Sequence, residues 1–596
     1  MSSIQTLDTK TQSEQHKQRK YGYGQLLTTY LLPQRRRVLL LVLLLFIGIA
    51  LQIVNPLIVQ NFIDTATAHG PLSTLLYIAL AFLLIAISGQ AIAIGETYIA
   101  ENVSLVATNR LRADLMLHCL QLDPAFFAVY TPGELIERVD GDVTKLSNFF
   151  SRLMIVLVGN AMLLAGVLFM LFRIDWRIGG ALTVFAIVAF VLVVLVRNVG
   201  VPYWKKALQA QALLFGFLEE RFSGTEDIRS SGAVPYSIRE LQQHSRSVLR
   251  KTRLASQIGL VSWTTMILLF TIGTAIALAF SVSLYRAGTI SIGTVYLIFA
   301  YTTLLERPIQ QITRQIEDLQ QATAGIVRIR TLFGITSGIV DGTGASLPPG
   351  PLSVKMRDVT FAYTEDAPTL QHISLTLRPG EVLGLLGHTG SGKTTLTKLL
   401  VRLYDPQQGN ILLDEQDVRA MRLHELRQHV GVVTQDVQLF NATVRDNLTF
   451  FDQHISDERI LQTLHDIGLK SWYASLSDGL DTRLAPGGSG LSAGEAQLLA
   501  FARVFLKAPG LVILDEASSR LDPATERHLE RAIDHLLQGR TCIIIAHRLA
   551  TVQRANTIMI LENGVCREYG ARTALAQDGD SRFSHLLHTG LEGVLS

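Results

Sequence analysis

The amino-acid sequence predicts a multi-domain membrane protein, in which an all-α transmembrane domain with long cytoplasmic helical extensions precedes an α/β domain. Two observations predict this order. Apolar stretches long enough to cross a bilayer occur only in the first half of the chain, and short β-rich runs alternating with helical runs begin near residue 351. The chain has 596 residues, room for several domains, and only 17% of them are charged, against roughly 25% in ordinary globular domains.

Six stretches of the first half approach the about 20 apolar residues that a transmembrane helix needs. They lie at about 38–60, 75–97, 153–173, 178–198, 259–283 and 289–306. Residues 35–37 are three arginines, whereas residues 61–73 contain no lysine or arginine. The positive-inside rule therefore places the N-terminus in the cytoplasm, and six spans return the chain there. The loop FRIDWRIGG, which carries two arginines, fits this topology less well.

The polar stretches at about 100–152 and 199–258 are rich in helix formers and have turn-prone centres near Gly133 and Gly232. We expect each to be a pair of helices that leave the bilayer and are joined by a short crossing helix, because long structureless connections are rare. The predicted domains are a polar tail at 1–20, a transmembrane domain at 21–325, a linker at 326–350 and the α/β domain at 351–596.

Charge and cysteine content exclude other classes. A net charge of +3 lacks the basic excess of a nucleic-acid binder, so no nucleic-acid partner is expected. Cys119, Cys542 and Cys566 lie far apart without metal-ligand spacing, which indicates free thiols in a reducing compartment.

The second half carries a phosphate-loop sequence between a strand and a helix. The runs VLGLLG, NILLD, VGVVTQ, LVILDEA, TCIIIAH and TIMILENG alternate with helical stretches, which predicts a mostly parallel sheet. After VLGLL the chain reads GHTGSGKT, a full match to G-x-x-x-x-G-K-[ST]. The residues of this loop are Gly387, His388, Thr389, Gly390, Ser391, Gly392, Lys393 and Thr394.

Each residue type in this loop suits a nucleoside triphosphate. Glycines let backbone N–H groups curl around the phosphates, and the following helix adds its positive end. Lys393 is predicted to hold the β- and γ-phosphates, and the hydroxyl of Thr394 to complete the coordination shell of Mg²⁺. ATP and Mg²⁺ are therefore the predicted cofactors, and the neighbouring Thr395 joins the predicted binding set.

Two further apolar strands end in residues with catalytic chemistry. Asp515 ends LVILD, where its carboxylate could reach Mg²⁺, and Glu516 beside it could polarise the attacking water. Without the phosphate loop nearby, a purely structural role at the end of the strand would explain these two carboxylates equally well. His547 follows TCIIIA and could reach the γ-phosphate, although a lone histidine is more often structural.

This set of motifs resembles that of an ATP-binding cassette (ABC) exporter half-transporter of the type I exporter-like, type IV fold, over roughly residues 21–590. The resemblance implies that Tyr363 in VTFAYTED stacks on adenine, and that Gln435 in GVVTQDVQLF binds near Mg²⁺ and acts in catalysis. It also implies that LSAGE, with Ser492 and Gly494, corresponds to the family signature LSGGQ, and that Asp522 lies in the D-loop. Turns near Phe126–Tyr130 and Gly224–Arg229 would be coupling helices that rest on the cassettes.

Two departures from the family pattern stand close together. In LSAGE, Ala493 adds a Cβ that would cost most at a positive φ, and the carboxylate of Glu495 would repel a triphosphate. In LAPGG, which spans residues 484–488, Pro486 stands about where exporters usually carry a glutamate. The phosphate loop is therefore sound while the signature is weakened.

The predicted function is ATP-driven export of a hydrophobic or amphipathic substrate, such as a lipid, drug or peptide, across the cell membrane. The alternative is a membrane-anchored nucleotide-binding regulator or gate with weak ATPase activity. The weakened signature favours a heterodimer with a second half-transporter over a homodimer. The predicted protein is a multi-pass protein of a bacterial plasma or inner membrane, with the lipid bilayer as a partner and the nucleotide-binding domain in the cytoplasm.

Overall fold

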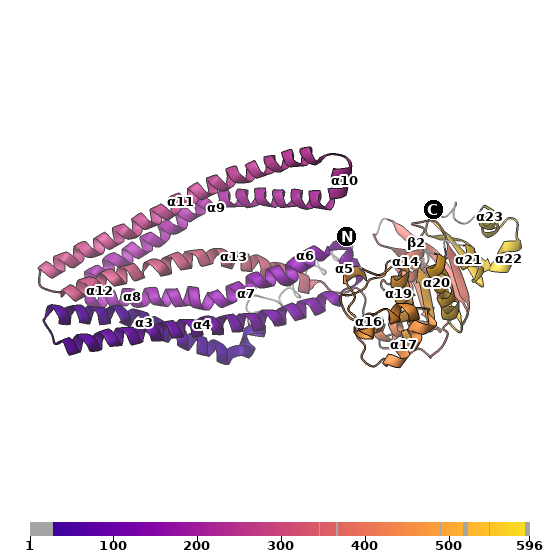
Figure 1. Cartoon of the computed structure of the whole chain (residues 1–596), viewed down its shortest axis with the longest axis horizontal. Coiled ribbons are helices and arrows are strands. Elements are labelled where there is room, and N and C mark those ends of the chain that lie inside the picture. The colour runs from indigo at the N-terminus through magenta and orange to yellow at the C-terminus, as the bar shows by residue number, and fades with distance from the viewer. Residues whose placement is uncertain are drawn as a thin grey trace, which may run out of the picture. The chain divides into compact units, whose positions relative to one another are not determined.

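The computed structural model in Figure 1 describes residues 28–344, 346–364, 367–488, 490–515, 523–546 and 549–589. These residues form two compact units. The first, here the helical unit, holds the described residues of Met1–Leu122 and Tyr130–Thr336. The second, here the sheet unit, holds those of Asp123–Val129 and Ser337–Ser596. A helical domain followed by an α/β domain is the predicted fold class, and it is confirmed.

The helical unit consists of long α-helices joined by short loops. Its elements are η2 (Leu32–Gln34), α3 (Arg35–Thr67), α4 (Leu72–Leu120), α6 (Pro132–Ile136), η3 (Glu137–Asp142), α7 (Val143–Arg152), η4 (Leu153–Val158), α8 (Gly159–Ile174), α9 (Trp176–Ser223), α10 (Thr225–Ser230), α11 (Val234–Arg286), α12 (Ile292–Leu304) and α13 (Glu306–Gly334). Helices α9 and α11 run for 48 and 53 residues without interruption and are joined by the short α10. The pair of helical extensions with a short crossing helix that was expected at about 199–258 is therefore present.

Five helices of the described chain are long and apolar enough to cross a membrane. Four of them contain a predicted span, and the third, Val156–Ile174, begins three residues after the start of the predicted span at about 153–173. The sixth predicted span coincides with α12, which has only 13 residues and continues into α13 through Leu305 in helical geometry. A membrane crossing by this segment stays a prediction, since about 20 residues are needed.

Small residues let the helices of this unit approach closely. Leu163, Val167 and Leu171 form one buried stripe on α8 at intervals of four residues. On α11, a Cβ at Gly273 would lie 2.3 Å from the ring of Phe185 on α9. Glycine at such a contact is typical of membrane helix packing.

A cluster of ion pairs around the buried carboxylate of Asp142 joins α13 to η3. Asp142, with no exposed side chain, accepts a hydrogen bond of 2.7 Å from Arg328 Nε and one of 3.3 Å from Lys145 Nζ. Burial alone would raise the pKa of Asp142, but the hydrogen bonds and charges of Arg328 and Lys145 hold it below its usual value. The η3 and η4 segments are π-helical, which the sequence did not indicate.

The sheet unit contains two sheets covered by short helices. Its elements are α5 (Pro124–Val129), β1 (Val354–Ala362), β2 (Pro368–Leu377), β3 (Val382–Leu386), α14 (Lys393–Leu400), β4 (Gln408–Leu413), β5 (Gln416–Asp417), α15 (Leu423–His429), β6 (Val430–Val433), α16 (Val444–Thr449), α17 (Asp457–Asp466), α18 (Lys470–Ala474), η5 (Gly479–Asp481), η6 (Pro486–Gly488), α19 (Ala493–Lys507), β7 (Leu511–Asp515), α20 (Pro523–Leu537), β8 (Thr541–Ile545), α21 (Leu549–Gln553), β9 (Thr557–Glu562), β10 (Val565–Ala571), α22 (Arg572–Gln577) and α23 (Arg582–Thr589).

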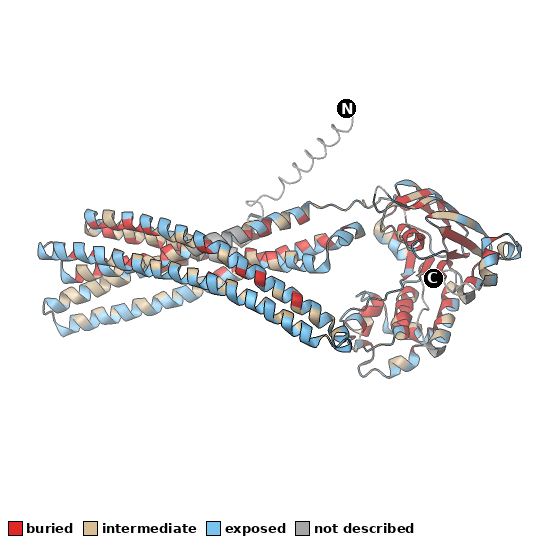
Figure 2. Ribbon diagram, turned by 90° about the horizontal axis from the view of Figure 1, so that it is seen from above, coloured by how far each residue is buried: buried red, intermediate tan, exposed pale blue. Residues whose placement is uncertain are grey.

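The larger sheet has the strand order β10-β9-β3-β8-β7-β6 and is parallel except for the pair β9–β10. All residues of β3 and β8 are buried, as expected for central parallel strands. In Figure 2 the buried residues gather around this sheet, whereas the long helices are exposed along much of their length.

The run NILLD does not belong to the parallel sheet. It lies in β4, within a separate antiparallel sheet of order β2-β1-β4-β5. The sequence prediction placed all six runs in one sheet and was wrong for this one. Short connections such as that between β4 and β5 join antiparallel strands, since a parallel pair needs a long crossover.

Candidate nucleotide site

The phosphate loop joins β3 to α14 through backbone conformations that glycine adopts most easily. Gly387, Gly390 and Gly392 have φ values of +149°, +82° and +104°. A Cβ at Gly387 would lie 2.2 Å from the carbonyl oxygen of Leu561, and one at Gly392 would lie 2.6 Å from a methyl carbon of Leu370. Positive φ and lack of space therefore both require glycine at these two positions.

Ser391 and Lys393 place polar groups inside this loop. Ser391 is buried, and its Oγ has no hydrogen-bond partner among the described residues. Lys393 is 7% exposed, and its Nζ donates to the carbonyl oxygens of Gly387 at 2.6 Å and His388 at 3.0 Å. An unsatisfied buried hydroxyl and a lysine folded onto its own loop both suit a phosphate ligand, whose oxygens accept hydrogen bonds. His388 and Thr389 are exposed at the tip of the loop.

The strand order brings the predicted Mg²⁺ ligands to one edge of the sheet. Strands β3 and β7 flank β8 in a parallel arrangement, so the loops after them lie at the same edge. Thr394 Oγ1 donates to Asp515 Oδ2 at 3.4 Å. Gln435 follows the next strand, β6, and is exposed. Hydroxyl, carboxylate and amide oxygens are ligands of the type that Mg²⁺ takes, so these residues fit the ion.

Three predicted residues fall outside the described part of the chain. Glu516 directly follows β7, Asp522 precedes α20, and His547 comes two residues after β8. Their roles stay predictions that rest on the sequence.

Tyr363 belongs to an aromatic cluster beside the phosphate loop. Its ring centroid lies 4.9 Å from that of Phe361 and 5.2 Å from that of Tyr404. Its hydroxyl lies 3.2 Å from Thr395 Oγ1, and Lys398 Nζ lies 5.9 Å from its ring centre. The side chain is still 47% exposed. An aromatic ring that is supported by neighbouring rings and remains half exposed is suited to stacking on a base.

The signature residues form the N-terminus of α19. Ser492 is the N-cap, and its Oγ accepts a hydrogen bond of 3.2 Å from the Glu495 backbone N–H. In return, Glu495 Oε2 accepts hydrogen bonds from the Ser492 backbone N–H at 2.8 Å and from Ser492 Oγ at 2.9 Å. This is a complete capping box, so the Ser492 hydroxyl is held by the carboxylate of its own helix.

The backbone at Ala493 has no positive φ. Ala493 is the first residue of α19, it is exposed, and it is not among the described residues with positive φ. A Cβ at this position is therefore compatible with the backbone, and the largest cost, which was expected only at a positive φ, does not apply. Gly494, by contrast, is buried.

The LAPGG stretch forms a turn against residues 439–442. Gly487 and Gly488 have φ values of +67° and +75°, and Gly487 N donates to the Leu439 carbonyl at 3.2 Å. Leu484 N donates to the Ala442 carbonyl at 2.9 Å. The LAPGG stretch is therefore a turn tied by backbone hydrogen bonds to residues 439–442.

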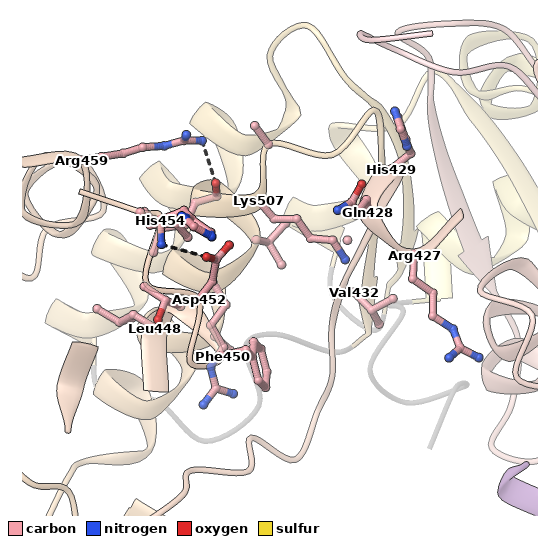
Figure 3. A pocket seen from close by; sticks show the side chains of 18 of the residues that line it. Arg427, Gln428, His429, Val432, Leu448, Phe450, Asp452, His454, Arg459 and Lys507 are labelled. Atoms are coloured by element: carbon pink, nitrogen blue, oxygen red, sulfur yellow. Dashed lines mark hydrogen bonds between the residues drawn. The ribbon is translucent and has the colours of Figure 1, made fainter. Parts of the chain in front are cut away.

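A basic cleft beside β6 was not predicted (Figure 3). It has a volume of about 1150 Å³, and its basic residues include Arg427, Arg459, Arg503 and Lys507. Lys507 Nζ donates to the Val430 carbonyl at 3.0 Å, and burial together with the charge of Arg427 lowers its pKa. These residues come from α15, α17 and α19, so no local sequence pattern indicates the cleft.

Comparisons with known proteins identify both units. Residues 38–309 match the family model of the ABC transporter transmembrane region, and residues 370–519 match that of the ABC transporter. An ATP-dependent lipid A-core flippase of Syntrophus aciditrophicus is 31% identical over 501 residues, which cover 83% of this chain and 82% of the flippase. The flippase of Pseudomonas fluorescens (strain Pf-5) is 32% identical over 520 residues, or 86% and 85% of the two chains.

A solved structure shares the fold. A bacterial Atm1-family ABC exporter with ATP bound superposes with a TM-score of 0.78 at 24% identity, covering 93% of this chain and 98% of the exporter chain.

Proposed function

The chain belongs to the ABC transporter family as a membrane-embedded, ATP-hydrolysing exporter half, and we propose that it pairs with a different half-transporter to export an amphipathic substrate. ABC exporters work as dimers in the lipid bilayer. The observation that carries the choice of a heterodimer is the hydrogen bonding of Ser492 by Glu495. In this family the signature of one chain caps the ATP held by the other.

The proposed catalytic cycle uses the side chains of the phosphate loop first. Binding of ATP gives Lys393 phosphate oxygens in place of the two loop carbonyls that its Nζ now contacts. Ser391 Oγ gains an acceptor, and backbone N–H groups at the start of α14 face the phosphates. Tyr363 stacks on the adenine and fixes the orientation of the nucleotide.

Water activation is assigned to residues at the carboxyl ends of β7 and β8. Thr394, Asp515 and Gln435 would hold Mg²⁺, which neutralises charge on the phosphate oxygens when it is bound. Glu516 orients and polarises the attacking water, and His547 binds the γ-phosphate. Asp522 acts across the dimer interface.

The heterodimer is proposed because this chain has an intact phosphate loop but an altered signature. Glu495 brings a carboxylate to the position that must approach the partner's triphosphate, where like charges repel. In a homodimer both sites would suffer this repulsion. In a heterodimer, the sound phosphate loop of this chain meets an ordinary signature, and the weakened signature covers a partner site with reduced activity.

Expression of this chain alone, followed by measurement of ATP turnover, tests the proposal. We expect slow turnover that rises on addition of the partner half-transporter. Vigorous hydrolysis by a stable homodimer would exclude the heterodimer, whereas slow hydrolysis with every partner would favour the regulator or gate. Glu516→Gln in the active complex should lower turnover by a factor of about 10² to 10⁴ while ATP still binds.

The proposed substrate is hydrophobic or amphipathic. Two similar proteins are lipid A-core flippases. The apolar faces of α3 and α4, with exposed residues such as Leu43, Phe46, Leu83 and Ile87, suit contact with acyl chains. Stimulation of ATP turnover by lipids, drugs and peptides in reconstituted vesicles separates these classes.

The proposed location is the plasma or inner membrane of a bacterium, with the sheet unit and α10 in the cytoplasm. The arginines at residues 35–37 support this orientation. A cysteine placed at Thr67 should react with an impermeant reagent added outside cells, and one placed at Ser230 should not. The reverse pattern would overturn the topology.

A further inference from the structure

Residues 402–407, here the RLYDPQ segment, follow helix α14 of the phosphate loop and begin with a buried arginine. Arg402 is 3% exposed and has a φ of +51°, which is uncommon for residues other than glycine. Its Nε donates to Asp405 Oδ1 at 2.9 Å, and its Nη2 donates to Asp405 Oδ2 at 3.3 Å. This two-point ion pair closes the start of the segment into a turn and holds Arg402 in its unusual conformation.

The same guanidinium holds residues 337–344, here the linker segment, which lead from α13 toward β1. Arg402 Nη2 also donates to the Val340 carbonyl at 2.9 Å. Nη1 is buried and has no hydrogen-bond partner in the described part of the chain, where Asp405 and Val340 supply all the acceptors of this side chain. Because a buried charge needs its hydrogen bonds, loss of the Val340 carbonyl would leave a further N–H of the guanidinium without a partner.

The linker segment is fixed to the sheet unit on both sides of this contact. Before it, Gly338 N donates to Asp123 Oδ2 at 2.7 Å. After it, Gly344 N donates to the Ala420 carbonyl at 2.7 Å, and a Cβ at Gly342 would lie 2.2 Å from the same oxygen. Only glycine fits so close to a backbone carbonyl, so the position of the acceptor for Arg402 depends on Gly342.

The far end of the RLYDPQ segment holds Tyr363. The ring centroid of Tyr404 lies 5.2 Å from that of Tyr363, with the two rings perpendicular at 90°. Gln407 Nε2 donates to the Ala362 carbonyl at 2.7 Å, and Gln407 Oε1 accepts a hydrogen bond of 2.9 Å from the Ala362 N–H. Gln407 therefore bonds both backbone groups of the residue before Tyr363, while Tyr404 supports the ring itself edge to face. The position of the ring that is proposed to stack on adenine thus depends on the RLYDPQ segment.

We propose that Arg402 is a positioning residue for ATP binding. It holds the RLYDPQ segment against the linker segment, and Tyr404 and Gln407 in turn hold the Tyr363 ring in place for the adenine. Anchoring of the linker segment and binding of the base then strengthen each other, since a coupling between two sites acts equally in both directions. The part of this inference that concerns adenine rests on the proposed stacking at Tyr363.

Gly342→Ala tests the linker contact without changing a charge. The new Cβ must move the linker segment away from Ala420, and with it the Val340 carbonyl away from Arg402. The purified full-length protein is titrated calorimetrically with a non-hydrolysable ATP analogue and with inorganic triphosphate, which has no base. We expect the affinity for the analogue to fall about fivefold and that for triphosphate to stay within about twofold. Gly334→Ala, where a Cβ would meet nothing within 4 Å, is the matched control and should change neither affinity.

Arg402→Lys is the second variant. It keeps the buried positive charge but lacks the planar fork that reaches Asp405 and Val340 together. We expect the same selective loss of affinity for the ATP analogue. Once Tyr363 is changed to alanine, neither Gly342→Ala nor Arg402→Lys should weaken analogue binding much further, because the coupled ring is gone. A merely structural role would lower both affinities and would act with or without the ring.

Hydrogen–deuterium exchange of the unmodified protein gives an independent measurement. Exchange of the Gly342 and Gly344 amides should slow about fivefold on binding of the ATP analogue and should not slow on binding of triphosphate. Equal slowing by both ligands would overturn the inference, as would equal losses of the two affinities in the variants.

The affinity of Tyr363→Ala separates this inference from the proposed function. Unchanged affinity of Tyr363→Ala for the ATP analogue would contradict the proposed stacking, and this inference with it. A loss in Tyr363→Ala without any loss in Gly342→Ala and Arg402→Lys would contradict the inference alone.

Discussion

The phosphate loop and the signature loop both lead into a helix N-terminus, yet their polar groups are arranged in opposite ways. The phosphate loop has three glycines at positive φ and a buried serine hydroxyl without a described partner. The signature has Ser492 at φ −67°, and both its backbone N–H and its hydroxyl are bound by Glu495.

This difference shows that a helix N-terminus does not by itself make a phosphate site. Donors are available to a ligand only where the chain does not satisfy them. At the phosphate loop, a ligand supplies hydrogen bonds that the protein lacks. At the signature, a ligand must compete with a capping box that is worth about 0.5–2 kcal/mol for its serine alone.

The largest expected effect is at the phosphate loop. Lys393→Ala should weaken ATP binding by a factor of about 30 to 1,000 or more, because a buried charge-assisted contact contributes roughly 2–5 kcal/mol. Titration of the purified protein with a fluorescent ATP analogue measures the change. Lys470→Ala, at an exposed lysine on α18, is the matched control and should bind ATP normally.

The second largest effect is expected at Tyr363, which is proposed to stack on the adenine base. Tyr363→Ala should weaken ATP binding by about 5- to 150-fold, since stacking on an aromatic ring is worth about 1–3 kcal/mol per base. Tyr363→Phe keeps the ring and loses only the contact with Thr395, so its affinity should stay within about threefold. Equal losses in the two variants would show that the hydroxyl, and not the ring, is the important group.

A smaller effect of opposite sign is expected at the signature. Glu495→Gln keeps a carbonyl that can accept the Ser492 N–H but removes the negative charge. ATP turnover of this chain expressed alone, where Glu495 faces an intact phosphate loop, should rise about fivefold, because like-charge repulsion of roughly 1 kcal/mol near the triphosphate is relieved. Steady-state phosphate release measures it. Unchanged or slower turnover would mean that the carboxylate does not impair the site.

The smallest effect is expected at Ala493. Ala493→Gly restores the family residue at a position that is already helical and exposed. Turnover should change less than about twofold, and stability should fall by at most about 1 kcal/mol, because glycine is the poorer helix former. A large rise in turnover would reveal close backbone approach in the dimer. Thermal unfolding of the same variant provides the stability value.

The features of the two loops that depend on neighbouring residues in the sequence were predictable, and those that depend on the exact start of a helix were not. GHTGSGKT specifies its own conformation, since its glycines, its lysine and the flanking strand and helix are contiguous. At LSAGE the start of the helix is predictable from the sequence, but the φ of Ala493 and the hydrogen bonds of Glu495 depend on the residue at which the helix begins, which varies by one or two residues.

Features made by distant residues were not predictable. The antiparallel sheet brings β4 next to β1, and nothing in NILLD distinguishes it from a parallel strand. Helices α3 and α12 lie side by side although they are more than 200 positions apart in the sequence, as the hydrogen bond of Gln60 to Thr294 illustrates.

The short helix α5 makes the sheet unit discontinuous along the chain. Asp123–Val129 groups with residues from Ser337 onward, and Asp123 Oδ2 accepts a hydrogen bond of 2.7 Å from Gly338 N. The polypeptide consequently passes between the units at three points, after Leu122, Val129 and Thr336. After a single proteolytic cut near residue 337, α5 belongs to the N-terminal fragment but still packs in the sheet unit, so noncovalent contacts hold the two fragments together. A polypeptide that begins at Ser337 lacks α5 and with it the Asp123 acceptor for its own Gly338 N–H.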